Sequence, residues 1–386
     1  MPAVSRSCDV VERVPDSMFT MRFWHTGSMP TDFASRLMHW HATHGRHDLP
    51  WQTMGTRPDP YPVWVSEIML QQTRVDTVIP YFQRFMARFP DISSLARADE
   101  DEVLALWSGL GYYGRARNLH AAARLIAQRH GGRFPYDHAA IQQLPGIGRS
   151  TAAAIGAFAF ARRRAVLDGN VKRVLARVFG VAGWPGDRVV EARLWQLAES
   201  LLPRSGIRAY TQGIMDLGAL LCTRTQPRCD VCPFAAECVA HREGRYRTLP
   251  GPRPGKALPE KTTAMLVMTH GGRVMLEKRP RSGIWGGLWS LPEHPAGEDM
   301  VHAAMHQGFQ VLTCEPLPHV VHGFTHLRLH IRPWLVAVSR PTGIATPARV
   351  WLPLRALHDT ALPAPVRRIL AALAVSGGEA SARDAA

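Results

Sequence analysis

Hydrophobic residues recur at every third or fourth position through the first two thirds of the chain. Val75, Val78 and Phe82 are one example of this spacing, which places side chains on one face of a helix. Short breaks rich in glycine and proline, such as residues 183–186, separate the periodic segments. We therefore predict an all-α domain of many short helices over residues 31–245.

The pattern changes after residue 245. Residues 246–260 are rich in proline and glycine, which cannot sustain a helix or a strand, so we predict a linker there. Strand-like alternation follows at residues 262–269, 273–278 and 320–338. Helical spacing follows at residues 301–307 and 365–374. These segments predict a second domain, of α+β type, over residues 261–375.

The two ends of the chain are expected to lie outside these domains. Residues 376–386 are mostly small and polar, and we predict a flexible tail. Residues 1–30 mix charges of both signs without a continuous apolar core, so we expect no secretory signal and assign this extension no role. Because no apolar run reaches the ~18 residues that a membrane span needs, we expect a cytoplasmic protein with no membrane contact.

The chain is strongly basic, with a formal net charge of +15 and an isoelectric point near 10.3. Hydrophobic residues make up 46% of it, which argues for a folded core and against disorder. A basic excess of this size favours an acidic partner, and the phosphate backbone of nucleic acid is the simplest one. Charge alone also fits a generic basic protein.

Four of the six cysteines fall close together, at Cys222, Cys229, Cys232 and Cys238. One tight cluster in a long chain indicates a metal site in a reducing compartment rather than a disulfide framework. Structural zinc sites usually carry two close cysteine pairs, whereas only Cys229 and Cys232 form such a pair here, so the spacing favours a [4Fe–4S] cluster. We expect this cluster mainly to stabilise the fold.

A glycine-containing turn joins two helical segments at residues 144–151. Gly146 and Gly148 let the backbone turn sharply and approach a ligand closely, and the free N–H groups at the start of the next helix attract anions. Asp137 is a candidate cap of the preceding helix. This is the helix–hairpin–helix pattern of proteins that grip DNA without reading its sequence, although an ordinary turn between helices has the same composition.

Two carboxylic acids are candidates for acid–base chemistry. Glu67 shares a helix face with Val63 and Trp64, and a carboxyl on an apolar face has the raised pKa that a general acid needs at neutral pH. Asp168 precedes a helix, whose positive end is expected to keep it ionised. Such a pair suits glycosidic cleavage. Both positions also fit structural roles, as a buried hydrogen-bonded glutamate and as a helix cap.

Taken in order along the chain, these segments resemble one family. The Glu67 helix, the run 109–113 (Gly-Leu-Gly-Tyr-Tyr), the hairpin, residues 167–170 (Leu-Asp-Gly-Asn) and the cysteines occur in the order found in adenine DNA glycosylases of the MutY type, members of the endonuclease III superfamily. The resemblance covers residues 31–365 and is looser in the second domain. It implies a multidomain protein, with an all-α helix–hairpin–helix glycosylase domain carrying the [4Fe–4S] loop at 222–238, followed by an α+β Nudix-like domain.

The resemblance also implies roles for individual residues. Glu67 matches the acid that protonates N7 of an extruded adenine, Asp168 the carboxylate that stabilises or briefly bonds to the oxocarbenium sugar, and Asn170 a residue that organises water and sugar. The positions that match the adenine pocket are Trp51, Leu70, Gln212 and Ser150. Those that match the residues entering the emptied base stack are Gln71, Gln72 and Tyr112.

The hairpin separates this chain from the bifunctional members of the superfamily. Those enzymes carry a lysine there as the nucleophile for a Schiff base, and Ser150 occupies that place here. We therefore predict a monofunctional enzyme without strong lyase activity. Lys172 is the nearest other amine in the sequence, and we interpret it as a phosphate contact, together with the backbone at Gly146 and Gly148.

The second domain resembles the recognition module of the same family. It lacks the glutamate-rich helix with which a working Nudix hydrolase binds magnesium, so we expect it to bind rather than to hydrolyse. Phe324, Thr325 and His326 match the Phe-Ser-His of the family that recognises 8-oxoguanine opposite adenine. Thr325 adds a methyl group to the hydroxyl, which leaves the strength of that preference open. Residues 53–61, beside the presumed base pocket, are longer than in familiar members.

The expected partner is double-stranded DNA with adenine opposite 8-oxoguanine or guanine, bound by a monomer in a bacterial nucleoid. Two alternatives remain open. Ser150 and the second domain disfavour a pyrimidine-damage glycosylase with lyase activity. Only the pair Glu67 and Asp168 disfavours a DNA-binding iron–sulfur protein that scans without cutting, and it does so mainly through the resemblance.

Overall fold

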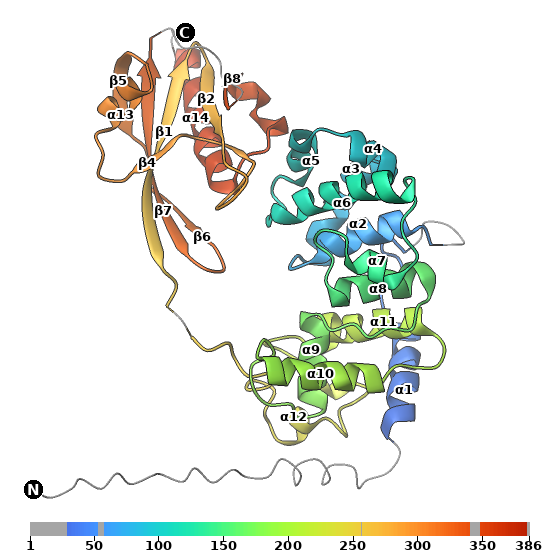
Figure 1. The fold of residues 1–386 in the computed structure, drawn as a ribbon. Coiled ribbons are helices and arrows are strands. Elements are labelled where there is room, and N and C mark those ends of the chain that lie inside the picture. The colour runs from blue at the N-terminus through green and yellow to red at the C-terminus, as the bar shows by residue number, and fades with distance from the viewer. Residues whose placement is uncertain (1–28, 53–57, 256, 340–347, 384–386) are drawn as a thin grey trace, which may run out of the picture.

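The computed structural model describes residues 29–52, 58–255, 257–339 and 348–383, which form a helical domain and a sheet domain (Figure 1). The predicted extension at 1–30 and the predicted loop at 53–61 therefore lie largely outside the described residues. The helices of the first domain are α1 (Met29–His44), α2 (Pro60–Leu70), α3 (Val75–Arg88), α4 (Ile92–Arg97), α5 (Glu100–Trp107), α6 (Gly114–His130), α7 (His138–Gln142), α8 (Arg149–Phe160), α9 (Gly169–Val178), α10 (Arg188–Ser200), α11 (Ile207–Asp216) and α12 (Val239–Arg242). The prediction of an all-α domain is confirmed.

Two hydrophobic cores hold the helical domain together. One lies among α2 to α6 and contains Trp64, Phe82 and Trp107, and the other lies among α1, α9, α10 and α11. Alternate faces of α8 join them, because its Ala152 and Ile155 belong to the first core and its Ala153, Ala154 and Ala157 to the second. The two candidate acids therefore come from opposite sides of α8.

Aspartates begin several of these helices. Asp137 accepts a hydrogen bond from the N–H of Ala140 at the start of α7, and Asp168 accepts one from the N–H of Val171 at the start of α9. Asp59 does the same for α2, where Pro60 occupies the first turn. These caps satisfy N–H groups that have no partner within the helix, and they confirm the two caps expected from the sequence.

The second domain is built on an eight-stranded sheet. Its central strands β1 and β7 run parallel, and β1 forms a hairpin with β2 through Gly271 and Gly272. Both glycines have positive φ, as a tight turn requires. The strands are β1 (Glu260–His270), β2 (Arg273–Lys278), β3 (Trp289–Ser290), β4 (Glu293–Pro295), β5 (Val311–Pro316), β6 (Val320–Gly323), β7 (Arg328–Val338) and β8 (Arg349–Pro353).

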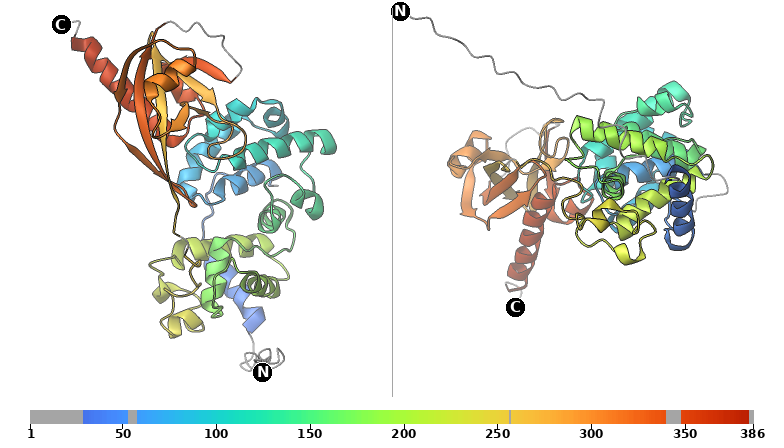
Figure 2. Two further views of the ribbon diagram at one scale, coloured as in Figure 1. Left: turned by 60° about the vertical axis from the view of Figure 1, so that its left-hand side comes forward. Right: turned by 90° about the horizontal axis from the view of Figure 1, so that it is seen from below.

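Two helices cover opposite faces of the sheet. Along β1, Met265 and Val267 face the core that contains α14 (Ala364–Arg383), whereas Leu266 and Met268 face the core that contains α13 (Met300–His306). This alternation follows from the two-residue period of a strand. α14 extends well beyond the sheet (Figure 2). The helix continues past its predicted end at residue 374 as far as Arg383, although Gly377 and Gly378 are weak helix formers.

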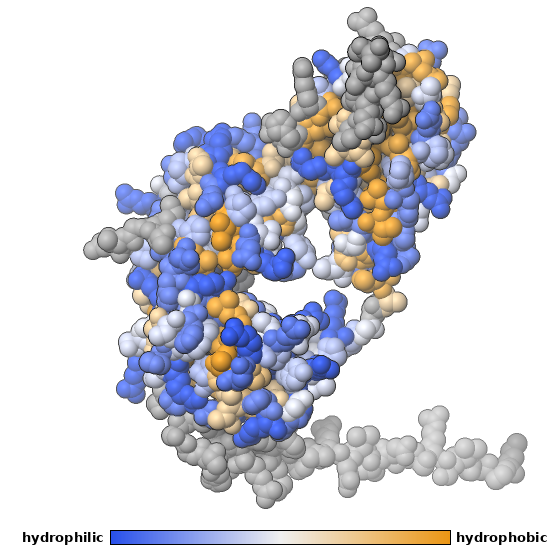
Figure 3. All heavy atoms as spheres, turned by 180° about the vertical axis from the view of Figure 1, so that it is seen from behind, coloured by the Kyte–Doolittle hydropathy of each residue, from blue (hydrophilic) through white to orange (hydrophobic). Residues whose placement is uncertain are grey.

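The two domains meet along α5, α6 and the loop between them. Asp101 accepts hydrogen bonds from Trp289 Nε1, at 3.1 Å, and from Lys278 Nζ. After α5, Ser108 Oγ donates to the carbonyl of Leu362 at 3.2 Å. The linker at residues 246–260 joins the domains at a different place from these contacts. The space-filling view shows an opening between the two domains (Figure 3). Among the described helices, none is long and apolar enough to cross a membrane.

Candidate active site

Glu67 lies on α2 and opens onto a cavity of about 210 Å³. Trp51 and Gln212, both predicted for the base pocket, line the same cavity, as do His41 and Arg46. These side chains come from α1, the loop after it, α2 and α11, so the cavity lies between the two cores. The structure thus brings one candidate acid together with two of the four predicted pocket residues.

The environment of Glu67 favours its protonated form. Burial raises its pKa to about 8, and the negative charge of Asp168 adds to the shift. A carboxylic acid that keeps its proton at neutral pH can donate it to a bound group. The raised pKa agrees with the expectation drawn from the apolar face of this helix.

Asp168 lies just before α9, where Val171 N–H donates to it at 2.8 Å and Asn170 Nδ2 at 3.3 Å. Burial raises the pKa of Asp168, and these donors together with the charge of Arg173 oppose the rise without reversing it. The expected effect of the helix end is therefore present, but desolvation of the carboxylate is larger. Asp168 nevertheless acts on Glu67 as a negative charge.

Asn170 connects the acid to the cysteine loop. Its Oδ1 accepts from Arg173 Nη2 at 2.9 Å, and Arg173 also donates to the carbonyls of Gly218 and Cys222 at 2.7 Å each. The side chain of Asn170 is therefore held between Asp168 and a guanidinium. The loop that carries the cysteines fixes this guanidinium in turn.

Two predicted pocket residues do not line the cavity. Ser150 Oγ instead accepts a hydrogen bond from the N–H of Leu167 at 2.9 Å, which holds the segment leading to Asp168 against α8. Leu70 ends α2 and packs against the core of the first domain. In this structure Ser150 therefore positions the backbone before Asp168.

The segments predicted to enter the base stack carry unusual backbone conformations. Gln72 and Tyr112 have φ values of +60° and +50°, a left-handed region that is rare for residues other than glycine and is concentrated at functional sites. Tyr112 is 45% exposed. One buried side chain, that of Arg115, ties both segments together by donating to the carbonyls of Ile68, Met69, Gln71, Leu110 and Gly111.

The hairpin lies beside these segments. Gln71 Nε2 donates to the carbonyl of Gly146 and to Thr151 Oγ1, at 3.3 Å each. Gly146 has φ +80°, and a Cβ there would come 2.8 Å from the Cβ of Asn118, so glycine is required on both counts. Gly148 precedes α8 without a side-chain cap, which leaves its first N–H groups available to an anion.

Lys172, predicted as a phosphate contact, lies on α9 and donates to Glu191 Oε1 at 2.7 Å. Both side chains are partly exposed, so a phosphate would compete with the glutamate for this ammonium group. The structure therefore places Lys172 in an ion pair within the protein.

The four clustered cysteines line one small cavity beside Arg177. Arg177 donates to Cys222 Sγ at 3.4 Å and to the carbonyl of Thr223 at 2.6 Å. Burial raises the pKa of the Cys232 thiol to about 11. Within the described residues, no group of three or more potential ligands is arranged to hold a single metal ion. Four thiols that line one cavity are a donor set of the kind that an iron–sulfur cluster takes.

The predicted recognition residues of the second domain lie in the loop between β6 and β7. Phe324 packs against Trp285, with ring centroids 5.5 Å apart, and its N–H donates to the carbonyl of Leu327 at 2.8 Å. Thr325 and His326 are exposed. The loop is therefore anchored through the phenylalanine and presents the next two side chains to solvent.

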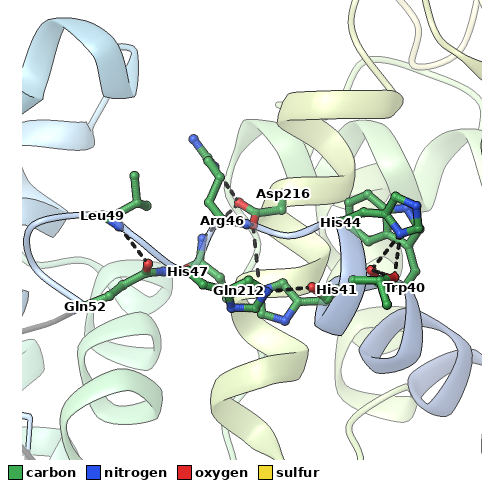
Figure 4. Close-up of polar contacts among 10 residues, drawn as sticks. Trp40, His41, His44, Arg46, His47, Leu49, Gln52, Gln212 and Asp216 are labelled. Carbon is green, nitrogen blue, oxygen red and sulfur yellow. Dashed lines mark hydrogen bonds and ion pairs between the residues drawn. The ribbon is translucent and has the colours of Figure 1, made fainter.

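Sequence reasoning missed a buried polar network beside the cavity. Asp216, at the end of α11, contacts Arg46 and Gln212, and His41 lies beside it (Figure 4). A signal was present in the sequence, since Asp216 stands between the apolar Met215 and Leu217, where an aspartate is rarely buried without a charged partner. The partner, however, is 170 residues away.

The chain matches two family models. Residues 65–200 match that of the HhH-GPD superfamily of base excision DNA repair proteins, and residues 263–372 match that of the NUDIX domain. These matches and the observed helices and sheet confirm the predicted types of the two domains.

The chain is also similar to known proteins along most of its length. It is 38% identical to the adenine DNA glycosylase of Buchnera aphidicola, over 88% of this chain and 96% of that protein. It is 35% identical to the adenine DNA glycosylase of Rattus norvegicus, over 88% of this chain and 77% of that protein. The corresponding human protein is 32% identical, over 88% of this chain and 73% of that protein.

Proposed function

Because this chain belongs to the adenine DNA glycosylases, the base-excision repair enzymes that bind DNA and hydrolyse the bond between adenine and its sugar, we propose that its substrate is adenine opposite 8-oxoguanine or guanine. The observation that carries the assignment of the site is the cavity in which Glu67, with a pKa of about 8, meets Trp51 and Gln212. The remaining features concern how the chemistry proceeds there.

Glu67 acts as the general acid. It transfers its proton to N7 of the extruded adenine, and the bond between N9 and C1′ then breaks with its electron pair going to the base. The sugar is left with oxocarbenium character, which the negative charge of Asp168 stabilises. Water adds at C1′, and the proton that it releases restores the acid form of Glu67, which completes the hydrolysis. Asn170, fixed between Asp168 and Arg173, positions the groups around the sugar.

The segments around Gln72 and Tyr112 hold the gap open when the base leaves the stack. Extruding a base costs a few kcal/mol, and least for a mispair. The exposed ring of Tyr112 offers a face on which a neighbouring base can stack. Arg115 fixes both segments in one arrangement, so little ordering is needed when DNA binds.

Among the described residues of the helical domain, no lysine amine is free, which supports a monofunctional enzyme. Lys172 is the one lysine of residues 31–245, and its ammonium group is paired with Glu191. The hydroxyl of Ser150 accepts from the N–H of Leu167. A Schiff base with the sugar requires an uncharged amine beside C1′, and none of these groups supplies one.

The loop at residues 324–326 recognises the base opposite adenine. Phe324 is anchored against Trp285, and the exposed Thr325 hydroxyl and His326 ring supply hydrogen-bonding groups. A hydroxyl can donate to or accept from the edge of an 8-oxoguanine. The domain thus contributes recognition while the chemistry stays in the helical domain.

The cysteines at 222, 229, 232 and 238 hold a [4Fe–4S] cluster that fixes the conformation of the loop. The buried thiols have raised pKa values as long as no cation balances them, and iron would stabilise their thiolate forms. Through Arg173, which donates to the carbonyl of Cys222, the loop supports the residues around Asp168.

The function is tested with four duplexes that carry adenine opposite 8-oxoguanine, guanine, cytosine or thymine. The expected result is release of adenine from the first two, no release from the last two, and no covalent complex after borohydride reduction. Release from all four would overturn the mispair assignment. Borohydride trapping that disappears in Lys172→Ala would overturn the monofunctional assignment.

A further inference from the structure

Asp216 is the most enclosed charged side chain beside the cavity, with 0% exposure. Arg46 surrounds it with donors: Nε at 2.9 Å and Nη2 at 2.5 Å to Oδ1, and its backbone N–H at 2.8 Å to Oδ2. Three donors of Arg46 thus face the two oxygens of Asp216. These oxygens therefore accept hydrogen bonds.

Gln212 lies one turn earlier on α11 and is oriented by this carboxylate. Its Nε2 donates to Asp216 Oδ1 at 2.9 Å, because the opposite orientation of the amide would place two acceptors against each other. The other end of the amide, Oε1, is then the group that Gln212 can offer to the cavity that it lines together with Glu67. No described residue donates a hydrogen bond to it.

His41 does not disturb this arrangement. It is 6% exposed, and its Nε2 lies 3.8 Å from Asp216 Oδ2, too far for a hydrogen bond. Burial lowers the pKa of His41 against the raising effect of Asp216, so the ring is neutral at pH 7. The charge of Asp216 is therefore directed to Arg46 and Gln212.

We propose that Asp216 is a positioning residue that determines which purine the pocket accepts, by turning the acceptor oxygen of Gln212 toward the base. Adenine presents N7 as an acceptor and N6 as a donor on the same edge, whereas a 6-oxopurine presents two acceptors. A protonated Glu67 can donate a hydrogen bond to N7 of adenine and of a 6-oxopurine alike. Only the 6-amino group suits Gln212 Oε1, and this inference rests on the proposed role of Glu67.

The test measures single-turnover release of adenine and of hypoxanthine, each opposite guanine in otherwise identical duplexes. Hypoxanthine carries an oxygen in place of the 6-amino group. Asp216→Leu keeps a similar shape but removes the acceptor, so the amide of Gln212 can turn either way. The ratio of adenine rate to hypoxanthine rate should fall about 10- to 100-fold, which is the effect of leaving one buried polar group unpaired. Gln212→Leu should lower the ratio to a similar extent.

Two comparisons separate positioning from a general loss of structure. In the Gln212→Leu background, Asp216→Leu should change the ratio no further, because both act through one amide. Gln83→Leu makes the same exchange of glutamine for leucine at an exposed position of α3 and should leave the ratio unchanged. Equal loss of both rates in Asp216→Leu, with an unchanged ratio, would overturn the proposal.

The proposal stays testable if Asp216→Leu does not fold. Wild-type protein and Gln212→Leu suffice, because equal ratios in these two would remove the selective role of the amide and with it that of Asp216. Failure of the proposed function has a different signature, since adenine release by Glu67→Gln would overturn the role of Glu67 whatever the ratios are.

Discussion

Burial raises the pKa of Glu67 to about 8, and the negative charge of Asp168, at the start of α9, adds to that shift. The two side chains belong to elements that pack in different cores, and α8 contributes to both cores. The hydroxyl of Ser150 on α8 fixes Leu167 beside Asp168. The fold thus sets a proton-bearing acid near an anion, which is the division of roles that glycosidic cleavage uses.

The rate of adenine release should depend on pH in a bell shape. Glu67 acts protonated, so the single-turnover rate should fall about tenfold per unit as pH rises beyond about 8. Asp168 acts in its ionised form, and burial raises its pKa. The rate should therefore also fall as pH is lowered, and this fall should begin at a higher pH than it would for an aspartate of ordinary pKa. A rate that stays flat between pH 8 and 10 would contradict the role of Glu67.

Replacing Glu67 should stabilise the protein while inactivating it. In the unfolded chain Glu67 ionises near pH 4.5, whereas in the folded protein it ionises only near pH 8. The folded protein therefore becomes less stable as pH rises between these values, because its buried carboxyl resists ionisation. Glu67→Gln has no proton to lose. Its free energy of unfolding in urea should exceed that of the wild type by about 4 kcal/mol at pH 8, and by nothing at pH 4. An equal difference at both pH values would show that packing, not ionisation, is responsible.

Arg115 should be needed both for stability and for activity on duplex DNA. Arg115→Met leaves the carbonyls of the two stack-entering segments without their donor and should cost about 3 kcal/mol in urea unfolding. The exposed Arg84, which lies over the ring of Tyr81, is the matched control, and Arg84→Met should cost less than about 1 kcal/mol. Similar losses in the two variants would refute the special role of Arg115.

The cysteine loop should bind iron. Purified protein should contain about four iron atoms per chain, and Cys238→Ser should lower that content and the melting temperature together. Cys314→Ser, in a strand of the second domain, serves as the control and should leave the iron content unchanged. Zinc in place of iron would contradict the [4Fe–4S] assignment.

Local features of this fold could be predicted from the sequence. The caps Asp137 and Asp168 depend only on the N–H groups two or three residues further on, and the alternation of Met265 and Leu266 between two faces depends only on the period of a strand. The raised pKa of Glu67 followed from its apolar neighbours on one helix face. Each of these features is fixed within one or two turns of the chain.

Features that depend on distant contacts could not be predicted. The carbonyls that Arg115 binds on α2 lie more than 40 positions earlier, and Asp216 meets Arg46 across 170 residues. The pKa of Asp168 was expected to be held down by its helix, but the depth of burial that raises it is a property of the packed domains. The hydrogen bond between Ser150 and Leu167 likewise joins α8 to the segment before α9 and could not be predicted from either segment alone.

The central claim is tested most directly by single-turnover adenine release from a duplex with adenine opposite 8-oxoguanine, using Glu67→Gln, with duplex affinity measured in parallel. Glutamine keeps the size and the polarity of the side chain but has no acidic proton to transfer to N7. The predicted result is a loss of release to background with affinity for the duplex unchanged within a few-fold. Adenine release at the wild-type rate would contradict the account.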